Sequence, residues 1–263
     1  MKRYSTILLV VVFAFGLLGI PSDAKTKGKK KKVEQPTCAA NIGVCAPEGC
    51  SSDNHHDPKL NILKNIPSND QSVTDRSMEW MKTHPDPKHY TRGGKRDELT
   101  NLDEGKQVRV VGYLLRAKLE LSGESCNCYL RTEAETDNHL VLVTKDTVRK
   151  FPIPKNSNWD TVNAIFHQRE WESITAEFTP RVRRANHPNF TSETMEALIK
   201  NAPAQALLVR VTGQLLFDSE HFKINPLHRV TSWEIHPIFR LEYCPKSKTC
   251  SPTGDANWID VDQ

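Results

Sequence analysis

Two short polar motifs in the middle of the chain combine residue types that bind metal ions. One residue separates Cys126 from Cys128, and one residue separates Asp137 from His139. Side chains repeat every two residues along a β-strand, so each motif presents its two groups on one face if both segments are strands. A hairpin that turns about 133–134 sets Cys128 opposite His139 and brings all four side chains to the same face. Two thiolates, an imidazole and a carboxylate are ligands for Zn²⁺ or copper, although a slip of one residue in register removes the site.

The two cysteines also fit interpretations without a metal ion. Cys126 pairs with a cysteine of the N-terminal region, or the two form a Cys-x-Cys bridge, or both are small buried apolar residues. A redox-active thiol is a further alternative. We favour a disulfide or a core role over a metal site.

A second group of acidic residues and histidines lies near the C-terminal end of the chain: Asp218, Glu220, His221, His228, Glu234 and His236. They flank a short connection between two expected strands, so we expect them to gather near one end of a hairpin. Glu234 and His236 share a face, and such a pair supports metal-assisted hydrolysis with Glu234 as the base. The favoured alternative is a hydrogen-bonded hairpin rim. Together, the two groups give these candidate metal ligands: Cys126, Cys128, Asp137, His139, Asp218, His221 and His236.

A third pattern predicts contacts with a polyanion. Arg181, Arg183 and Arg184 follow each other closely, and Trp171 precedes them. Arginines with interleaved aromatic residues suit phosphate contacts and base stacking on a barrel face. Single-stranded nucleic acid or an anionic glycan fits this pattern, whereas a solvated basic loop is the plainer alternative.

The N-terminus predicts export from the cytoplasm. Two basic residues precede an apolar run at 7–20, and small residues then lead to a cleavage site after Ala24. This is the pattern of a signal peptide over residues 1–24, and the apolar run is shorter than the ~20 residues of a membrane span. No second long apolar run follows, so no transmembrane segment is expected in the mature chain. We therefore expect a secreted or periplasmic protein.

Cysteine count and charge narrow the expectations further. All seven cysteines follow the signal peptide, and the odd number leaves at least one thiol unpaired or engaged elsewhere. Cys244 and Cys250 bracket a short turn, which a disulfide closes readily. The formal net charge is only +4, so no global basic field indicates nucleic-acid binding. Gly-x-Ser-x-Gly, Walker and His-Glu-x-x-His motifs are absent from the sequence, which disfavours those enzyme classes.

The chain divides into five parts by composition and pattern. After the signal peptide we expect a basic, cysteine-containing linker at 25–56, an extended N-terminal arm at 57–104, a β-barrel domain at 105–244 and a C-terminal tail at 245–263. Strand patterns are expected at 108–115, 125–132, 138–144, 174–178, 206–217 and 229–243, with a helix at 191–199. Central glycines bend the long strands at Gly112 and Gly213.

This order predicts a mainly β protein with one or two short helices. Strands in series, bent at glycines, with one late helix match an OB-fold-like small Greek-key barrel, and a β-sandwich is the alternative.

Several strings carry a resemblance to a known group. VRVVGYL, ESCNCYL with a following D-x-H, VRVTGQLLFDSEH, TSWEIHP and the earlier DPKLNILKN resemble uncharacterised secreted bacterial proteins. The core of that group is similar to OB-fold modules of the tRNA-anticodon-binding type. The resemblance covers about 57–66 and 105–243 and implies the fold, while leaving the activity open. The stretch 146–172 is longer and more irregular than the pattern of the group.

Two functions remain in competition. The favoured hypothesis is a secreted, non-catalytic OB-fold-like module that binds an extracellular polyanion or a protein partner. The alternative is a metal-dependent hydrolase, of phosphodiesterase type, that uses a His/Asp/Glu cluster and zinc.

Overall fold

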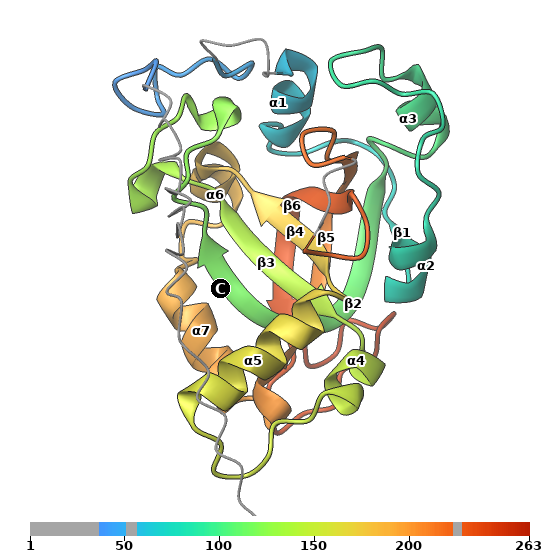
Figure 1. The fold of residues 1–263 in the computed structure, drawn as a ribbon, viewed down its shortest axis with the longest axis vertical. Helices are drawn as coiled ribbons and strands as arrows, with labels where there is room; N and C mark the ends of the chain where they lie inside the picture. Colours follow the sequence, from blue (N-terminus) through green and yellow to red (C-terminus); the bar gives the residue numbers. More distant parts are fainter. Residues whose placement is uncertain (1–36, 51–56, 223–227) are drawn as a thin grey trace, which may run out of the picture. The chain divides into compact units, whose positions relative to one another are not determined.

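The structure is a computed structural model that describes residues 37–50, 57–222 and 228–263. Five strands form a closed barrel (Figure 1): β2 (Gln107–Leu119), β3 (Asn138–Val143), β4 (Ile174–Phe178), β5 (Leu207–Phe217) and β6 (Trp233–Tyr243). The order around the barrel is β2-β3-β4-β6-β5, and β5 pairs with β2 to close it. The prediction of a mainly β protein with a small barrel is therefore confirmed, and the alternative of a β-sandwich is wrong.

The pairing directions decide which strand ends meet. Neighbouring barrel strands are antiparallel except for β4 and β6, which run parallel. Two short strands extend the sheet: β1 (Thr74–Arg76) pairs with β2, and β7 (Ile259–Asp260) pairs with β6. Because β4 and β6 are parallel, the end of β4 lies beside the first residues of β6.

Alternation along the strands separates an apolar interior from a polar outer face. Leu140 and Leu142 of β3, Ala176 and Phe178 of β4 and Ile235 of β6 are fully buried in one hydrophobic cluster. Residues between them in the sequence face away from this cluster, because side chains alternate along a strand. The outer face of the barrel therefore carries the intervening polar residues.

Helices decorate the barrel, and polar side chains cap most of them. Their ranges are α1 (Pro58–Lys64), α2 (Met78–Thr83), α3 (Asp97–Asn101), α4 (Lys145–Lys150), α5 (Trp159–Glu170), α6 (Pro180–Asn186) and α7 (Ser192–Asn201). Short 3₁₀ helices occur at η1 (Ser125–Asn127), η2 (Glu133–Glu135) and η3 (Pro203–Gln205). Asp57 caps α1 through hydrogen bonds from the backbone N–H groups of Lys59 and Leu60, as its preference for this position predicts. None of the described helices has the length and apolar composition needed to cross a membrane.

One expected strand is wrong. The segment 125–132 begins with η1 and then turns, because Cys128 and Tyr129 adopt left-handed backbone angles with φ of 54° and 58°. Backbone N–H groups of Cys38 and Cys50 donate to the carbonyls of Cys128 and Ser125. The N-terminal segment thus holds these residues in a loop, and β3 pairs directly with β2 instead.

Other expectations have clear outcomes. The helix expected at 191–199 is confirmed as α7, and the irregular stretch after β3 contains α4. The predicted signal peptide at 1–24 and much of the predicted linker at 25–56 lie outside the described residues.

Gly213 provides a test of the barrel packing. A Cβ atom at this position lies 2.4 Å from the carbonyl oxygen of Pro237 and 2.6 Å from Cγ2 of Ile235. We expect Gly213→Ala to lower the free energy of unfolding by about 1–3 kcal/mol, because the crowded strands must move apart. Urea denaturation measures this change. Gly254→Ala is the control, since its nearest contact is the Ser251 Cβ at 3.2 Å; equal losses in the two variants contradict the packing.

Candidate metal centre

Strand pairing aligns a histidine, a glutamate and a second histidine across three strands. His139 of β3 pairs with Glu177 of β4. Thr175 pairs with Glu234 across the parallel β4–β6 contact, and continuing this register by two residues sets Glu177 beside His236. All three alternate with core residues, so they lie on the outer face of the barrel. The registers of the β3–β4 and β4–β6 pairs therefore align His139, Glu177 and His236 in a row across the three strands.

Other segments cover this part of the outer face. Lys64 at the end of α1 lies over it, and Asn61 of the same helix donates a 3.1 Å hydrogen bond to Ser125 of η1. Figure 1 shows α1 and the loop between β2 and β3 at the same end of the barrel. As a result, His236 is fully buried and Glu177 is 2% exposed, although both point away from the barrel interior.

Glu177 is the centre of the arrangement. Its Oε2 lies 3.0 Å from Nε2 of His139 and 3.4 Å from Nδ1 of His236. Nδ1 of His236 also lies 3.2 Å from Oε1 of Glu234. The side chains of Asp137, Glu177 and His236 offer ligand atoms within 4.8 Å of one another, and so do those of Glu124, His139 and Glu177. Two three-residue groups therefore share Glu177.

Cys126 and Asp137 also belong to this cluster. Sγ of Cys126 lies 3.3 Å from Oε2 of Glu124 and 3.8 Å from Oδ2 of Asp137. Asn127 donates a hydrogen bond to the other oxygen of Asp137. Lys64 forms an ion pair of 3.3 Å with Glu124.

Negative charge exceeds permanent positive charge in this cluster. Among the described residues, the lysine and arginine side chains that form ion pairs with its carboxylates are Lys64 and Arg229, and Arg229 pairs with both Asp218 and Glu234. Arg183 interacts with Asp137 electrostatically at longer range. The carboxylates are Glu124, Asp137, Glu177, Asp218 and Glu234. Burying a charge is costly unless it is paired, so the cluster needs further positive charge.

The pKa shifts reflect this imbalance. Burial raises the pKa of Asp137 well above its ordinary value, and Glu124 raises it further. Burial also raises the pKa of Glu234. Burial lowers the pKa of His139, but Glu177 and Glu124 overcome this effect and hold the pKa well above its usual value. A proton on His139 thus supplies part of the missing positive charge.

His236 behaves differently from His139. Burial lowers the pKa of His236 to about 3, so its imidazole is neutral near pH 7. When Nδ1 carries the hydrogen and donates to Glu234, Nε2 presents a lone pair. This Nε2 atom is buried and has no hydrogen-bond partner among the residues that the structure describes. A lone pair without a partner in a carboxylate-rich pocket suits a metal ion.

Some of the ligands expected from sequence come together in the structure, and others do not. Cys126, Asp137, His139 and His236 come together as described. Cys128 does not join them, because it forms a disulfide with Cys45; its assignment as a ligand is wrong.

Asp218 and His221 bond to each other at the edge of the cluster. Nδ1 of His221 lies 2.6 Å from Oδ2 of Asp218, and Arg229 pairs with the same carboxylate. The His221 side chain is half exposed. His221 and Arg229 already occupy the carboxylate of Asp218. We therefore interpret Asp218 and His221 as residues that position Arg229, and not as metal ligands.

Sequence reasoning missed Glu177, Glu124 and Lys64. Glu177 is the outward residue of a short strand whose neighbours Ala176 and Phe178 are core residues. An isolated carboxylate in an apolar strand is a usable signal, since charged residues are rarely buried without a partner. Glu124 and Lys64 gave no local signal, because only the folded loop and α1 bring them to the site.

Two arginines of the predicted polyanion site bind the protein's own backbone. Arg183 donates to the carbonyls of Thr136 and Glu133 and to Asn138. Arg184 donates to the carbonyl of Ala134. These guanidinium groups hold the loop between β2 and β3.

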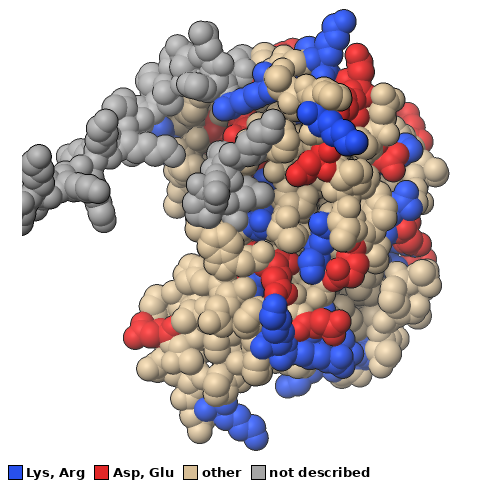
Figure 2. All heavy atoms as spheres, turned by 45° about the vertical axis from the view of Figure 1, so that its right-hand side comes forward, with Lys and Arg blue, Asp and Glu red and all other residues tan. Residues whose placement is uncertain are grey.

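Arg181 and Trp171 have other surroundings. Burial lowers the pKa of Arg181, and its Nε and Nη2 atoms are buried without a partner in the described part of the chain. Trp171 is about half exposed and lies against the ring of His228, with 4.8 Å between the ring centres. Figure 2 shows acidic and basic residues interspersed on one face of the molecule.

A pocket of about 340 Å³ opens beside the cluster. Its lining includes Lys118, His139, Thr175, His228 and Arg229. The His139 side chain is 23% exposed, whereas that of Glu177 is 3% exposed. His139 therefore lies between the buried carboxylates and a space that admits a small molecule.

Comparisons with known proteins give no assignment. No family model, no curated protein and no solved structure matches the chain. The geometry of the cluster is thus the basis for any functional conclusion.

The free thiol provides a test of the covalent arrangement. The structure pairs Cys38 with Cys50, Cys45 with Cys128 and, as predicted, Cys244 with Cys250, which leaves Cys126 free. Cys126 is 1% exposed, and burial raises its thiol pKa, with Asp137 and Glu124 adding to the shift. Without reductant, we expect no alkylation by iodoacetamide in native protein and one modification, at Cys126, in guanidinium.

Intact mass and peptide mapping measure both states. A Cys126 disulfide, or rapid alkylation of Cys126 in the native protein, contradicts this arrangement.

Proposed function

We propose that the protein is a metal-dependent hydrolase with one divalent ion bound by Asp137, Glu177 and His236. The buried Nε2 of His236, without a partner in the described structure, is the observation that carries this proposal. The excess of buried carboxylates supports it, because an ion with two positive charges supplies the missing charge. His139 and Glu124 lie on the other side of Glu177, toward the pocket.

Zinc is the ion that these ligands favour. Imidazole and carboxylate groups bind Zn²⁺ at about 2.0–2.2 Å, and three protein ligands leave a fourth position for water. Ligand atoms of a tetrahedral ion lie about 3.4 Å apart, and Asp137, Glu177 and His236 offer ligand atoms within 4.8 Å of one another. A bound ion lowers the pKa of its water and so supplies the nucleophile for hydrolysis.

The surrounding residues support a role for each side chain. Glu234 accepts from Nδ1 of His236 and is held by Arg229, so it orients the imidazole instead of acting as the base expected from sequence. His139 lines the pocket and contacts Glu177. We propose that His139, which carries a proton in this surrounding, donates it to the leaving group of the substrate.

The pocket composition supports an anionic ester as the substrate. Lys118 and Arg229 contribute to the lining together with Glu120 and Glu170, and His139 and His228 add imidazole groups. Lys118 pairs with Glu170, and Arg229 pairs with Asp218 and Glu234. Cationic groups stabilise the charge that develops on a phosphoryl group during displacement. A phosphodiester is therefore the substrate class that we propose. The alternative, polyanion binding through Arg181, Arg183 and Arg184, has less support because Arg183 and Arg184 hold a neighbouring loop.

We also propose that the mature chain is exported after cleavage near Ala24. The apolar run at 7–20 followed by small residues supports this assignment. Three disulfides in the described part of the chain support an oxidising compartment. The sequence resemblance to secreted OB-fold-like proteins agrees with both.

Metal binding is tested with Glu177→Gln, which removes a charge but keeps the shape. We expect unmodified protein to bind one equivalent of Zn²⁺ and the variant to bind at least about 100-fold more weakly, because Glu177 is a direct ligand. Elemental analysis and calorimetric titration of chelator-treated protein measure stoichiometry and affinity. Zinc at 100 times its Kd stabilises the unmodified protein by about 2.7 kcal/mol.

His167→Ala is the matched control for this measurement. His167 is an exposed histidine on α5 that pairs with Glu170 outside the cluster, so its loss leaves zinc affinity unchanged. The metal assignment is contradicted if Glu177→Gln binds zinc as tightly as the control.

Hydrolysis is tested with bis(p-nitrophenyl) phosphate as the substrate. We expect zinc-loaded protein to release p-nitrophenolate, and we expect Glu177→Gln to lower kcat/KM by at least about 100-fold, because the nucleophilic water is lost with the ion. His167→Ala retains the activity. Protein that binds stoichiometric zinc but does not hydrolyse the ester contradicts the hydrolase while leaving the metal site intact.

A further inference from the structure

A second pocket lies at the other end of strand β6 from the metal cluster. Its volume is about 490 Å³, and it is formed by the end of α7, the first residues of β5 and the end of β6. Seven residues separate His236 from Tyr243, and at about 3.3 Å per residue this corresponds to roughly 23 Å along the strand. This pocket is therefore separate from the proposed hydrolase site.

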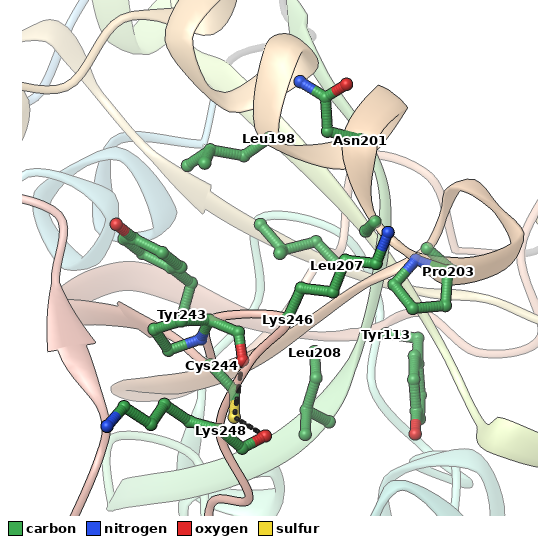
Figure 3. Close-up of a pocket in the computed structure, with 13 residues that line it drawn as sticks. Tyr113, Leu198, Asn201, Pro203, Leu207, Leu208, Tyr243, Cys244, Lys246 and Lys248 are labelled. Carbon is green, nitrogen blue, oxygen red and sulfur yellow. Dashed lines mark hydrogen bonds between the residues drawn. The ribbon is translucent and has the colours of Figure 1, made fainter.

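The walls of the pocket are largely apolar. Leu198 comes from α7, Leu207 and Leu208 come from β5, and Tyr113 and Tyr243 come from β2 and β6. Figure 3 shows the leucines between the two tyrosines. Leu208 is only partly buried, although it lies on the barrel. The volume falls in the ~300–1,000 Å³ range of small-molecule sites.

Two lysines accompany this apolar surface. Lys246 and Lys248 line the pocket from the loop that the Cys244–Cys250 disulfide closes. Both lysines are exposed, and no ion pair of the described residues involves either one. The neighbouring carboxylates Glu242 and Asp260 already pair with arginines. The pocket thus combines an apolar lining with uncompensated positive charge.

We propose that this pocket binds a fatty acid, with the acyl chain against the leucines and the carboxylate near Lys246 and Lys248. The apolar lining selects a hydrocarbon chain, since burying each CH₂ group is favourable. The lysines select an anionic headgroup by charge complementarity. The disulfide restricts the loop that carries them, which lowers the entropic cost of binding.

Binding is tested by calorimetry with octanoate and decanoate below their micelle concentrations and with decanol below its solubility limit. We expect saturable binding of one decanoate per chain. Shortening decanoate to octanoate weakens binding on the order of tenfold, because two CH₂ groups leave the pocket. Ala202→Phe, which fills the space beside Leu198, abolishes binding of both decanoate and decanol.

The charge requirement is tested with the double variant Lys246→Glu/Lys248→Glu. We expect it to weaken decanoate binding by about tenfold and to leave decanol binding unchanged. Lys88→Glu/Lys95→Glu is the control, since it changes the net charge equally at two exposed lysines outside the pocket lining. It leaves both ligands unaffected.

Any of four results overturns the proposal. The first is the absence of saturable decanoate binding, and the second is decanoate binding that persists in Ala202→Phe while circular dichroism shows the native fold. The third is equal weakening of decanoate in the pocket double variant and in its control. A pocket that binds decanol but not decanoate has the apolar lining without the anion selectivity, and this outcome also contradicts a fatty-acid site.

Discussion

An excess of buried negative charge is the constraint on which the rest of the site depends. Asp137 and Glu177 are almost completely buried, and the permanent cations Lys64 and Arg229 pair with other carboxylates. Such an arrangement is unfavourable in a protein interior unless protons or metal ions neutralise it. The raised pKa of Asp137 and of His139 shows protons in that role when no ion is bound. A divalent ion satisfies the same requirement.

Pairing of β4 with β3 and with β6 gathers these groups. The parallel contact between β4 and β6 brings Glu177 beside His236, and the antiparallel contact between β3 and β4 brings His139 to its other side. The outer face of a barrel is normally open to water. Here α1 and the loop between β2 and β3 cover it, so outward polar residues become buried. The N-terminal arm therefore turns an ordinary polar face into a low-dielectric site, in which charged groups interact strongly.

Much of the barrel was predictable from sequence because alternation and central glycines are local signals. The five barrel strands and α7 follow from such patterns, and His139 and His236 stood out as histidines in strands. The strand expected around Cys128 failed because a disulfide to Cys45 and left-handed backbone angles hold it in a loop. Glu177 was missed because one glutamate in a short strand says nothing about its cross-strand neighbours. Those contacts depend on which strands pair with β4, and the residues within β4 do not specify that β3 and β6 lie on its two sides.

The central claim is that Asp137, Glu177 and His236 bind one divalent ion on the outer face of the barrel. Crystals grown with zinc, with diffraction recorded on both sides of the zinc absorption edge, test it most directly. The account predicts one strong anomalous peak within about 2.0–2.2 Å of ligand atoms from all three residues. An ordered cluster without such a peak, with Nε2 of His236 bonded to water or protein instead, contradicts it.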